Sequence, residues 1–237
     1  MSSLRLTAVA SAILAAACAL AVPHARAATC GEGTYAYAGL GGKGAASGVS
    51  ATIVPTATPT VRDGHVDGWV GVGGPGLGPN GADEWIQVGL TAVPGAQNVA
   101  YYEIVRPGRG DVTKELRRNV TVGSRHTFAV REVAGKPNWW RVWLDGSPAS
   151  APVLLPKSHG RWAPQAVGES WAGSTSGTCN AYAYSFSNVR FASAAGGAWS
   201  PFVRVQPFQD PNYRLVRSSA SSFVARSAPA RAAANRP

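Results

Sequence analysis

Three polar side chains in strand-like, aromatic surroundings are the residues of this chain most suited to chemistry. Gln87 lies in an apolar run, Glu103 follows two tyrosines, and Glu169 comes two residues before Trp171. A carboxylate in an aromatic strand is costly to bury unless it is hydrogen-bonded, and such a group commonly has a perturbed pKa and a function. Most other acidic residues stand beside Gly, Arg or Lys in turn-like segments, as solvated surface charges do. We therefore take these three side chains as the first candidates for a functional site.

The segments that carry these residues have the pattern of β-strands. Apolar and polar residues alternate, or β-branched and aromatic residues gather, over 49–54, 69–72, 84–90, 100–105, 126–130, 139–144 and 182–191. Helical periodicity is nearly absent, because Gly and Pro interrupt most windows. On an alternating strand Trp85, Gln87 and Gly89 share one face. The pattern predicts an all-β fold, a two-sheet antiparallel β-sandwich.

One hairpin is visible in the sequence. The strand-like segment 126–132 is followed by the Trp-rich segment 139–144, then by Asp145-Gly146 and by a third short run near 153–155. Asp-Gly between two strands favours a two-residue turn in which both residues have positive φ. This order of elements resembles the hairpins of concanavalin A-like jelly rolls, the sandwiches of lectins and glucanases.

A family resemblance rests on four motifs in a fixed order. They are Trp69-Val-Gly-Val-Gly73, Trp85-Ile-Gln-Val-Gly89, Tyr101-Tyr-Glu103 and Ala166-Val-Gly-Glu-Ser-Trp171. In this order they resemble the successive strand motifs of the glutamic peptidases, the eqolisin family. The separations of 16 residues from Gln87 to Glu103 and 66 from Glu103 to Glu169 also suit that family. The similarity spans residues 68–191 and implies a jelly-roll sandwich.

The resemblance also implies a mechanism. Gln87 and Glu169 would be the catalytic pair, with Glu169 as the general base that activates water and then as the acid that protonates the leaving amine. The Gln87 amide would hold that water and donate to the oxyanion. Trp69 and Glu103 would support the pair or contact the substrate. The resemblance implies a polypeptide substrate, activity at acid pH, and no metal or cofactor.

Trp85 and Trp171 complete the predicted substrate-binding set, and they also belong to one of the alternative functions. The chain departs from the family pattern at Gly73, Ile104 and Ser170, which leaves an inactive relative open. A lectin-like module that binds carbohydrate or peptide at the cell surface would use aromatic platforms at Trp85, Tyr102, Trp162 and Trp171. A glycoside hydrolase would use Glu103 and Glu169 as its carboxylate pair.

The N-terminal end has the features of a secretory signal. A charged start and an apolar run precede Ala25-Arg-Ala27, which predicts a signal peptide over residues 1–27 and a secreted, extracellular protein of bacterial type. Removal of this segment leaves Cys30 and Cys179. Two cysteines near opposite ends of an exported domain most often pair, so we expect a Cys30–Cys179 disulfide. No second apolar segment follows, so we expect no membrane span in the mature protein.

The charge of the chain is unevenly distributed. The formal net charge is +10, and residues 194–237 hold six arginines but only one acidic residue, Asp210. We expect a β-sandwich domain over 28–193, a partly ordered extension over 194–217, and a disordered tail over 218–237, because the tail composition is too poor in large apolar residues to offset its ordering entropy. Since the charge lies outside the predicted core of an exported protein, we expect no nucleic-acid partner, and we expect a monomer.

Overall fold

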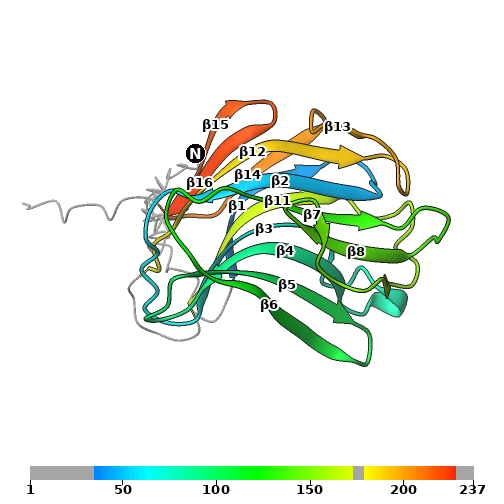
Figure 1. Ribbon diagram of the computed structural model, residues 1–237, viewed down its shortest axis with the longest axis horizontal. Helices are drawn as coiled ribbons and strands as arrows, with labels where there is room; N and C mark the ends of the chain where they lie inside the picture. Colours follow the sequence, from blue (N-terminus) through cyan, green and yellow to red (C-terminus); the bar gives the residue numbers. More distant parts are fainter. Residues whose placement is uncertain (1–34, 173–178, 228–237) are drawn as a thin grey trace, which may run out of the picture.

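The computed structural model describes residues 35–172 and 179–227, and these form two packed antiparallel sheets (Figure 1). The sheet that carries the candidate residues, called sheet A here, has the strand order β14-β1-β11-β3-β4-β5-β6. The second, sheet B, has the order β10-β8-β7-β2-β12-β16-β15, with β13 paired to β12 and β9 to β8. The predicted all-β, two-sheet sandwich is confirmed.

The bounds of the elements are as follows. Sheet A comprises β1 (Tyr35–Gly42), β3 (His65–Gly74), β4 (Glu84–Ala92), β5 (Asn98–Arg106), β6 (Gly110–Val120), β11 (Pro164–Trp171) and β14 (Val205–Gln209). Sheet B comprises β2 (Gly48–Pro55), β7 (His126–Glu132), β8 (Trp139–Leu144), β9 (Ser147–Pro148), β10 (Val153–Leu154), β12 (Ala183–Ala192), β13 (Trp199–Pro201), β15 (Tyr213–Ser219) and β16 (Ser222–Ser227). A 3-10 turn, η1 (Pro79–Gly81), lies in the Gly-rich segment before β4.

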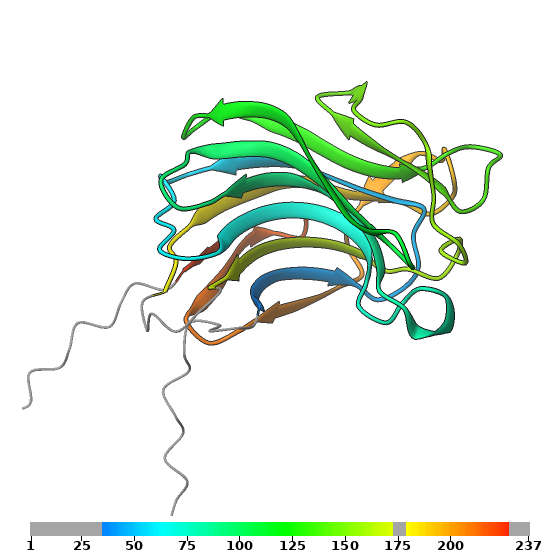
Figure 2. The same cartoon turned by 90° about the horizontal axis from the view of Figure 1, so that it is seen from below.

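Side-chain alternation divides each strand of sheet A between two environments. On β4, Ile86, Val88 and Leu90 belong to the core between the sheets, and each is 0% exposed. The alternate residues, Trp85 and Gln87, therefore point to the opposite face of the sheet. Figure 2 shows that the strands of this sheet are curved. The candidate residues thus lie on the face of sheet A that does not pack against sheet B.

The predicted hairpin is present, with one difference in its third strand. β7 pairs with β8, and Asp145 and Gly146 turn the chain with φ values of 49° and 80°. After the turn, β9 pairs with the end of β8. The predicted run near 153–155 forms β10, which pairs with the start of β8. The two-residue turn explains this, because it returns the chain at once beside β8 and leaves the later run to pair further along it.

The predicted disorder of the C-terminal region is wrong for residues 218–227. β16 lies inside sheet B between β12 and β15, and Phe223 is 1% exposed. Its ring stacks on Phe186 with a centroid distance of 4.5 Å. The predicted domain boundary at 193 is also wrong, because β14 extends sheet A beside β1. A few apolar residues at alternate positions are enough to order β16, because the neighbouring strands supply both hydrogen-bond partners and an apolar face.

The remaining predictions for the ends of the chain fall outside the described residues. These are the signal peptide over 1–27, Cys30 with its proposed disulfide, and the last part of the tail, 228–237. Among the described residues, no helix has the length and apolar character needed to cross a membrane.

Candidate active site

Five neighbouring strands of sheet A bring polar side chains to the outer face of the sheet. The registers place Glu169 on β11 opposite Asp67 on β3 and opposite Tyr37 on β1. Gln87 on β4 lies opposite Glu103 on β5. Because β1, β11 and β3 are distant in sequence but adjacent in the sheet, this face is assembled only when the sheet forms.

Two glycines keep the middle of this face free of side chains. Gly71 lies opposite Gln87, and a Cβ at Gly71 would stand 2.9 Å from the Gln87 Cβ. Gly89 lies opposite Trp69, and a Cβ there would stand 2.0 Å from the Gly68 carbonyl oxygen. The small residues leave room for the side chains of Trp69 and Gln87 to lie across the sheet.

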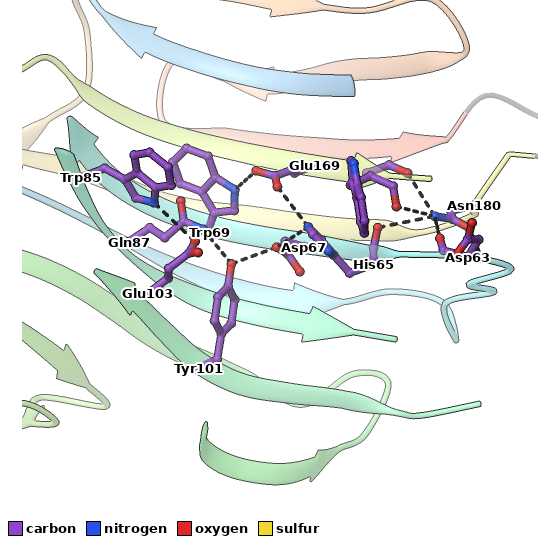
Figure 3. A network of polar contacts seen from close by, with 12 residues as sticks. Asp63, His65, Asp67, Trp69, Trp85, Gln87, Tyr101, Glu103, Glu169 and Asn180 are labelled. Atoms are coloured by element: carbon purple, nitrogen blue, oxygen red, sulfur yellow. Dashed lines mark hydrogen bonds and ion pairs between the residues drawn. The ribbon is translucent and has the colours of Figure 1, made fainter. Parts of the chain in front are cut away.

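Glu169 is 5% exposed, and two side chains contact its carboxylate (Figure 3). The Trp69 indole Nε1 donates to Glu169 Oε2 at 2.7 Å. His65 Nε2 lies 3.4 Å from Glu169 Oε1 and 3.6 Å from Asp67 Oδ2. One carboxylate oxygen is thus fixed by a neutral donor, while the other faces an imidazole.

Asp67 and His65 titrate under each other's influence. Burial, together with the nearby charge of Glu169, raises the pKa of Asp67 to about 7. Burial would lower the pKa of His65, but the hydrogen bond to Glu169 and the charge of Asp67 raise it on balance. Two carboxyl groups this close to one another cannot both hold a negative charge cheaply. The imidazolium form of His65 compensates the charge that remains.

Gln87 takes part in a different set of contacts from Glu169. Its Nε2 donates to Glu103 Oε2 at 2.9 Å and to the Tyr101 hydroxyl at 3.0 Å. The Tyr101 hydroxyl in turn donates to Asp67 Oδ2 at 3.0 Å, and Trp85 Nε1 lies 3.3 Å from Glu103 Oε2. Burial raises the pKa of Glu103. Within the described residues, the path of polar contacts from Gln87 to Glu169 runs through Tyr101, Asp67 and His65.

These side chains line one open cleft of about 540 Å³. Its aromatic lining residues include Tyr35, Tyr37, Trp69, Trp85 and Phe208. A cleft of this size suits a small molecule or a few residues of an extended chain.

The structure places most of the predicted site residues together. Gln87, Glu169, Trp69, Trp85 and Glu103 all line the cleft. The sixth, Trp171, stands beside it. Its ring lies 5.6 Å from that of His65 and 6.3 Å from that of Tyr35, centroid to centroid. The catalytic roles of these residues stay predictions.

Two of the four aromatic platforms proposed for a lectin-like function lie in the core. Tyr102 is 7% exposed and belongs to the hydrophobic core. Trp162 is 2% exposed and packs against Trp140 at a centroid distance of 6.3 Å. Alternation explains Tyr102, because its neighbours Tyr101 and Glu103 take the cleft face of β5.

Sequence reasoning missed His65 and Asp67. Asp67 precedes Gly68 and so has the local setting of a solvated turn charge, although Asp67 and Trp69 are two residues apart on one strand and share its face. Extending the predicted strand toward its N-terminus would have placed His65, Asp67 and Trp69 side by side.

His65, Asp67 and Glu169 are also the described residues best placed to hold a metal ion. One ligand atom of each lies within 4.8 Å of the others. An imidazole with two carboxylates suits divalent transition metals such as zinc or manganese. The expectation that no metal or cofactor is needed stays a prediction.

Comparison with known proteins supports the fold. No family model matches the sequence, and the search of curated proteins found no match. Among solved structures, the chain is similar to scytalidoglutamic peptidase in complex with a peptide-based transition-state analogue, with a TM-score of 0.60 and 15% identity over 81% of this chain and 98% of that one. It is similar to SCP-B, a member of the eqolisin family, in complex with the tripeptide Ala-Ile-His, with a TM-score of 0.54 and 15% identity over 81% and 97% of the two chains. The fold is therefore that of the glutamic peptidases.

Proposed function

We propose that this protein hydrolyses peptide bonds with water activated by Glu169 and with the assistance of Gln87. The observation that carries the proposal is the position of both side chains in one aromatic cleft, on a fold shared with glutamic peptidases. The chemistry needs a buried carboxyl group that can change its protonation state, a donor for the oxyanion and a cleft for an extended chain.

Glu169 performs the proton transfers. Its Oε1 takes a proton from a water molecule while the water oxygen attacks the carbonyl carbon of the scissile bond. The protonated carboxyl group then gives this proton to the amide nitrogen, the C–N bond breaks, and an acid and an amine leave. Trp69 holds Oε2 throughout, so only Oε1 is engaged in the transfers.

Gln87 can serve the oxyanion once its amide is released by protonation of its neighbours. Its Nε2 is directed toward Glu103 Oε2 and the Tyr101 hydroxyl. When Glu103 and Asp67 take up protons, both can act as hydrogen-bond donors. The direction of these hydrogen bonds then reverses. Asp67 donates to Tyr101, and both Tyr101 and Glu103 donate to Gln87 Oε1. Nε2 turns toward the cleft, where it can stabilise the oxyanion.

This reversal gives a physical reason for activity at acid pH. Burial raises the pKa of both Glu103 and Asp67. Their protonated forms therefore persist at a pH where exposed carboxyl groups are ionised.

The test is hydrolysis of an unfolded protein substrate at acid pH by wild type and by Glu169→Gln. We expect cleavage by the wild type and a loss of at least about a thousandfold in the variant. Asp145→Asn, which changes a carboxylate in the turn between β8 and β9, is the control for a general change in charge. Equal activity of Glu169→Gln and wild type would remove Glu169 from the mechanism.

A non-catalytic binding function is the second candidate, because Tyr35 is 51% exposed beside Trp171 at the end of the cleft. Binding of wild type and Glu169→Gln to a glycan array, without proteolysis by either, would favour it.

We also propose that the protein is exported, with residues 1–27 as its signal peptide. The charged start, apolar run and small residues before position 28 support this. N-terminal sequencing of protein recovered from the culture medium should begin at Ala28. A retained Met1 would contradict the proposal.

A further inference from the structure

The charge of the cleft is opposite to the charge of the protein. The chain carries 22 Lys and Arg against 12 Asp and Glu. Five of those acidic residues line the cleft, whereas its basic lining in the described part of the chain is His65, with no Lys or Arg. The five are Asp67, Glu103, Asp111, Glu115 and Glu169. A concave surface in which one sign of charge predominates concentrates ligands of the other sign.

The exposed acidic residues lie along one wall, on β6. Asp111 and Glu115 flank Thr113, which lies opposite Glu103 in the register. Glu115 Oε2 accepts a hydrogen bond from Arg118 Nε at 2.6 Å, so part of its charge is balanced locally. Asp111 is close enough to raise the pKa of Glu103 through its charge, after the larger effect of burial. Asp111 is thus the main exposed charge beside Glu103.

An aromatic surface lies next to this pair of carboxyl groups. Trp85 is half-buried and lines the cleft, and its Nε1 donates to Glu103 Oε2. An ammonium or guanidinium group beside an indole and a carboxylate gains both a cation–π interaction and an ion pair.

We infer that the preferred substrates are polypeptides with a lysine or arginine side chain, held between Asp111 and the Trp85 indole, which lie on either side of Val105 in the register. This inference rests on the proposed peptidase function and adds the class of substrate. At about pH 5 exposed carboxyl groups are mostly ionised, so attraction of a cation at the rim is compatible with activity in mild acid.

The test compares three peptides that differ at one position, which holds Lys, Met or Glu. Met is unbranched and close to Lys in length but neutral. We expect kcat/KM to be about tenfold higher for the Lys peptide than for the Met peptide, and lowest for the Glu peptide. Asp111→Asn should reduce the Lys-to-Met ratio to about threefold or less, and so should high salt.

Lys114→Gln is the matched control, because Lys114 lies on the same exposed strand but on its opposite face. It should leave the ratio unchanged. A ratio near one in the wild type, or a ratio that Asp111→Asn leaves intact, would overturn the inference.

Binding separates this inference from the proposed function. The same peptides are titrated onto Glu169→Gln by calorimetry, which needs no turnover. Tighter binding of the Lys peptide that Asp111→Asn weakens, with no cleavage by wild type, would support the inference and contradict the peptidase. Cleavage of all three peptides by wild type, with equal binding of the three to Glu169→Gln, would support the peptidase and contradict the inference.

Discussion

The indole of Trp69 reaches diagonally across the β3–β11 pair to hold Glu169. In the ladder Trp69 lies opposite Val167, whereas Glu169 lies opposite Asp67. The 2.7 Å bond from Nε1 to Glu169 Oε2 therefore joins residues two register positions apart on neighbouring strands. Both side chains are buried, which fixes the carboxylate in one orientation.

Trp69→Phe tests this contact. Phenylalanine keeps an aromatic ring but lacks the donor, so Glu169 Oε2 is left without its neutral partner. We expect kcat to fall about ten- to a hundredfold with little change in KM, because a hydrogen bond to a charged group is lost at the reacting carboxylate. Trp139→Phe on sheet B is the control. Equal kcat values in wild type and Trp69→Phe would show that the indole does not position Glu169.

Glu103→Gln tests the reversal of the hydrogen-bond chain around Gln87. The new amide can donate to Gln87 Oε1 at every pH, as only the protonated form of Glu103 can in the wild type. Burial raises the pKa of Glu103, so wild-type activity should fall as pH rises through that pKa. The fall should move to higher pH in the variant. Identical pH profiles of kcat would exclude Glu103 as the controlling group.

Glu84 predicts how stability depends on pH. Its carboxyl group is 0% exposed and has no hydrogen-bond partner among the described residues. Burial raises its pKa from 4.5 to about 7. The folded state thus holds a proton that the unfolded state releases, and the stability contribution is fully present below pH 4.5 and is lost as pH rises through about 7.

The measurement is the Tm of wild type and Glu84→Gln across this range. The wild type should lose Tm between pH 4.5 and 7, and the variant should lose less, because its amide does not ionise. Glu115→Gln, an exposed residue on β6, should follow the wild type. If the Tm of wild type and of Glu84→Gln fell in parallel with rising pH, the loss of Tm would come from other groups, of which Asp67 is the first to test.

Phe223→Ala tests the role of β16 in the sandwich. Phe223 is 1% exposed and stacks on Phe186, so its truncation should lower the free energy of unfolding by about 3–5 kcal/mol. Val216→Ala, whose side chain on β15 is 49% exposed, should change it by less than about 0.5 kcal/mol. Equal effects of the two substitutions in urea unfolding would mean that β16 adds little to the core.

The proposed Cys30–Cys179 disulfide would act next to the site. Asn180, the neighbour of Cys179, donates to the Asp63 carbonyl at 2.8 Å and to the Trp171 carbonyl at 3.2 Å. It thereby ties the chain before β3 to the end of β11. Peptide mapping without reductant should recover the two cysteines in one linked fragment. Reduction should then lower kcat as well as Tm, and a drop in Tm alone would separate the disulfide from the site.

The local sequence pattern is enough to predict the strands and the face on which several candidate residues lie. Alternation of period two is a local property, so Trp85 and Gln87 could be assigned to one face before any partner strand was known. Asp145-Gly146 likewise determined its own turn, because positive φ at both residues depends on the residues themselves.

Which residues become neighbours on these faces depends on long-range strand pairing. Glu169 lies beside Asp67 and His65 because β11 pairs with β3, and these strands are about a hundred residues apart. The hydrogen-bond partners of Gln87, and the stacking of Phe223 on Phe186, depend in the same way on long-range register. Such register is set by how all strands share one core, and no local pattern contains that information.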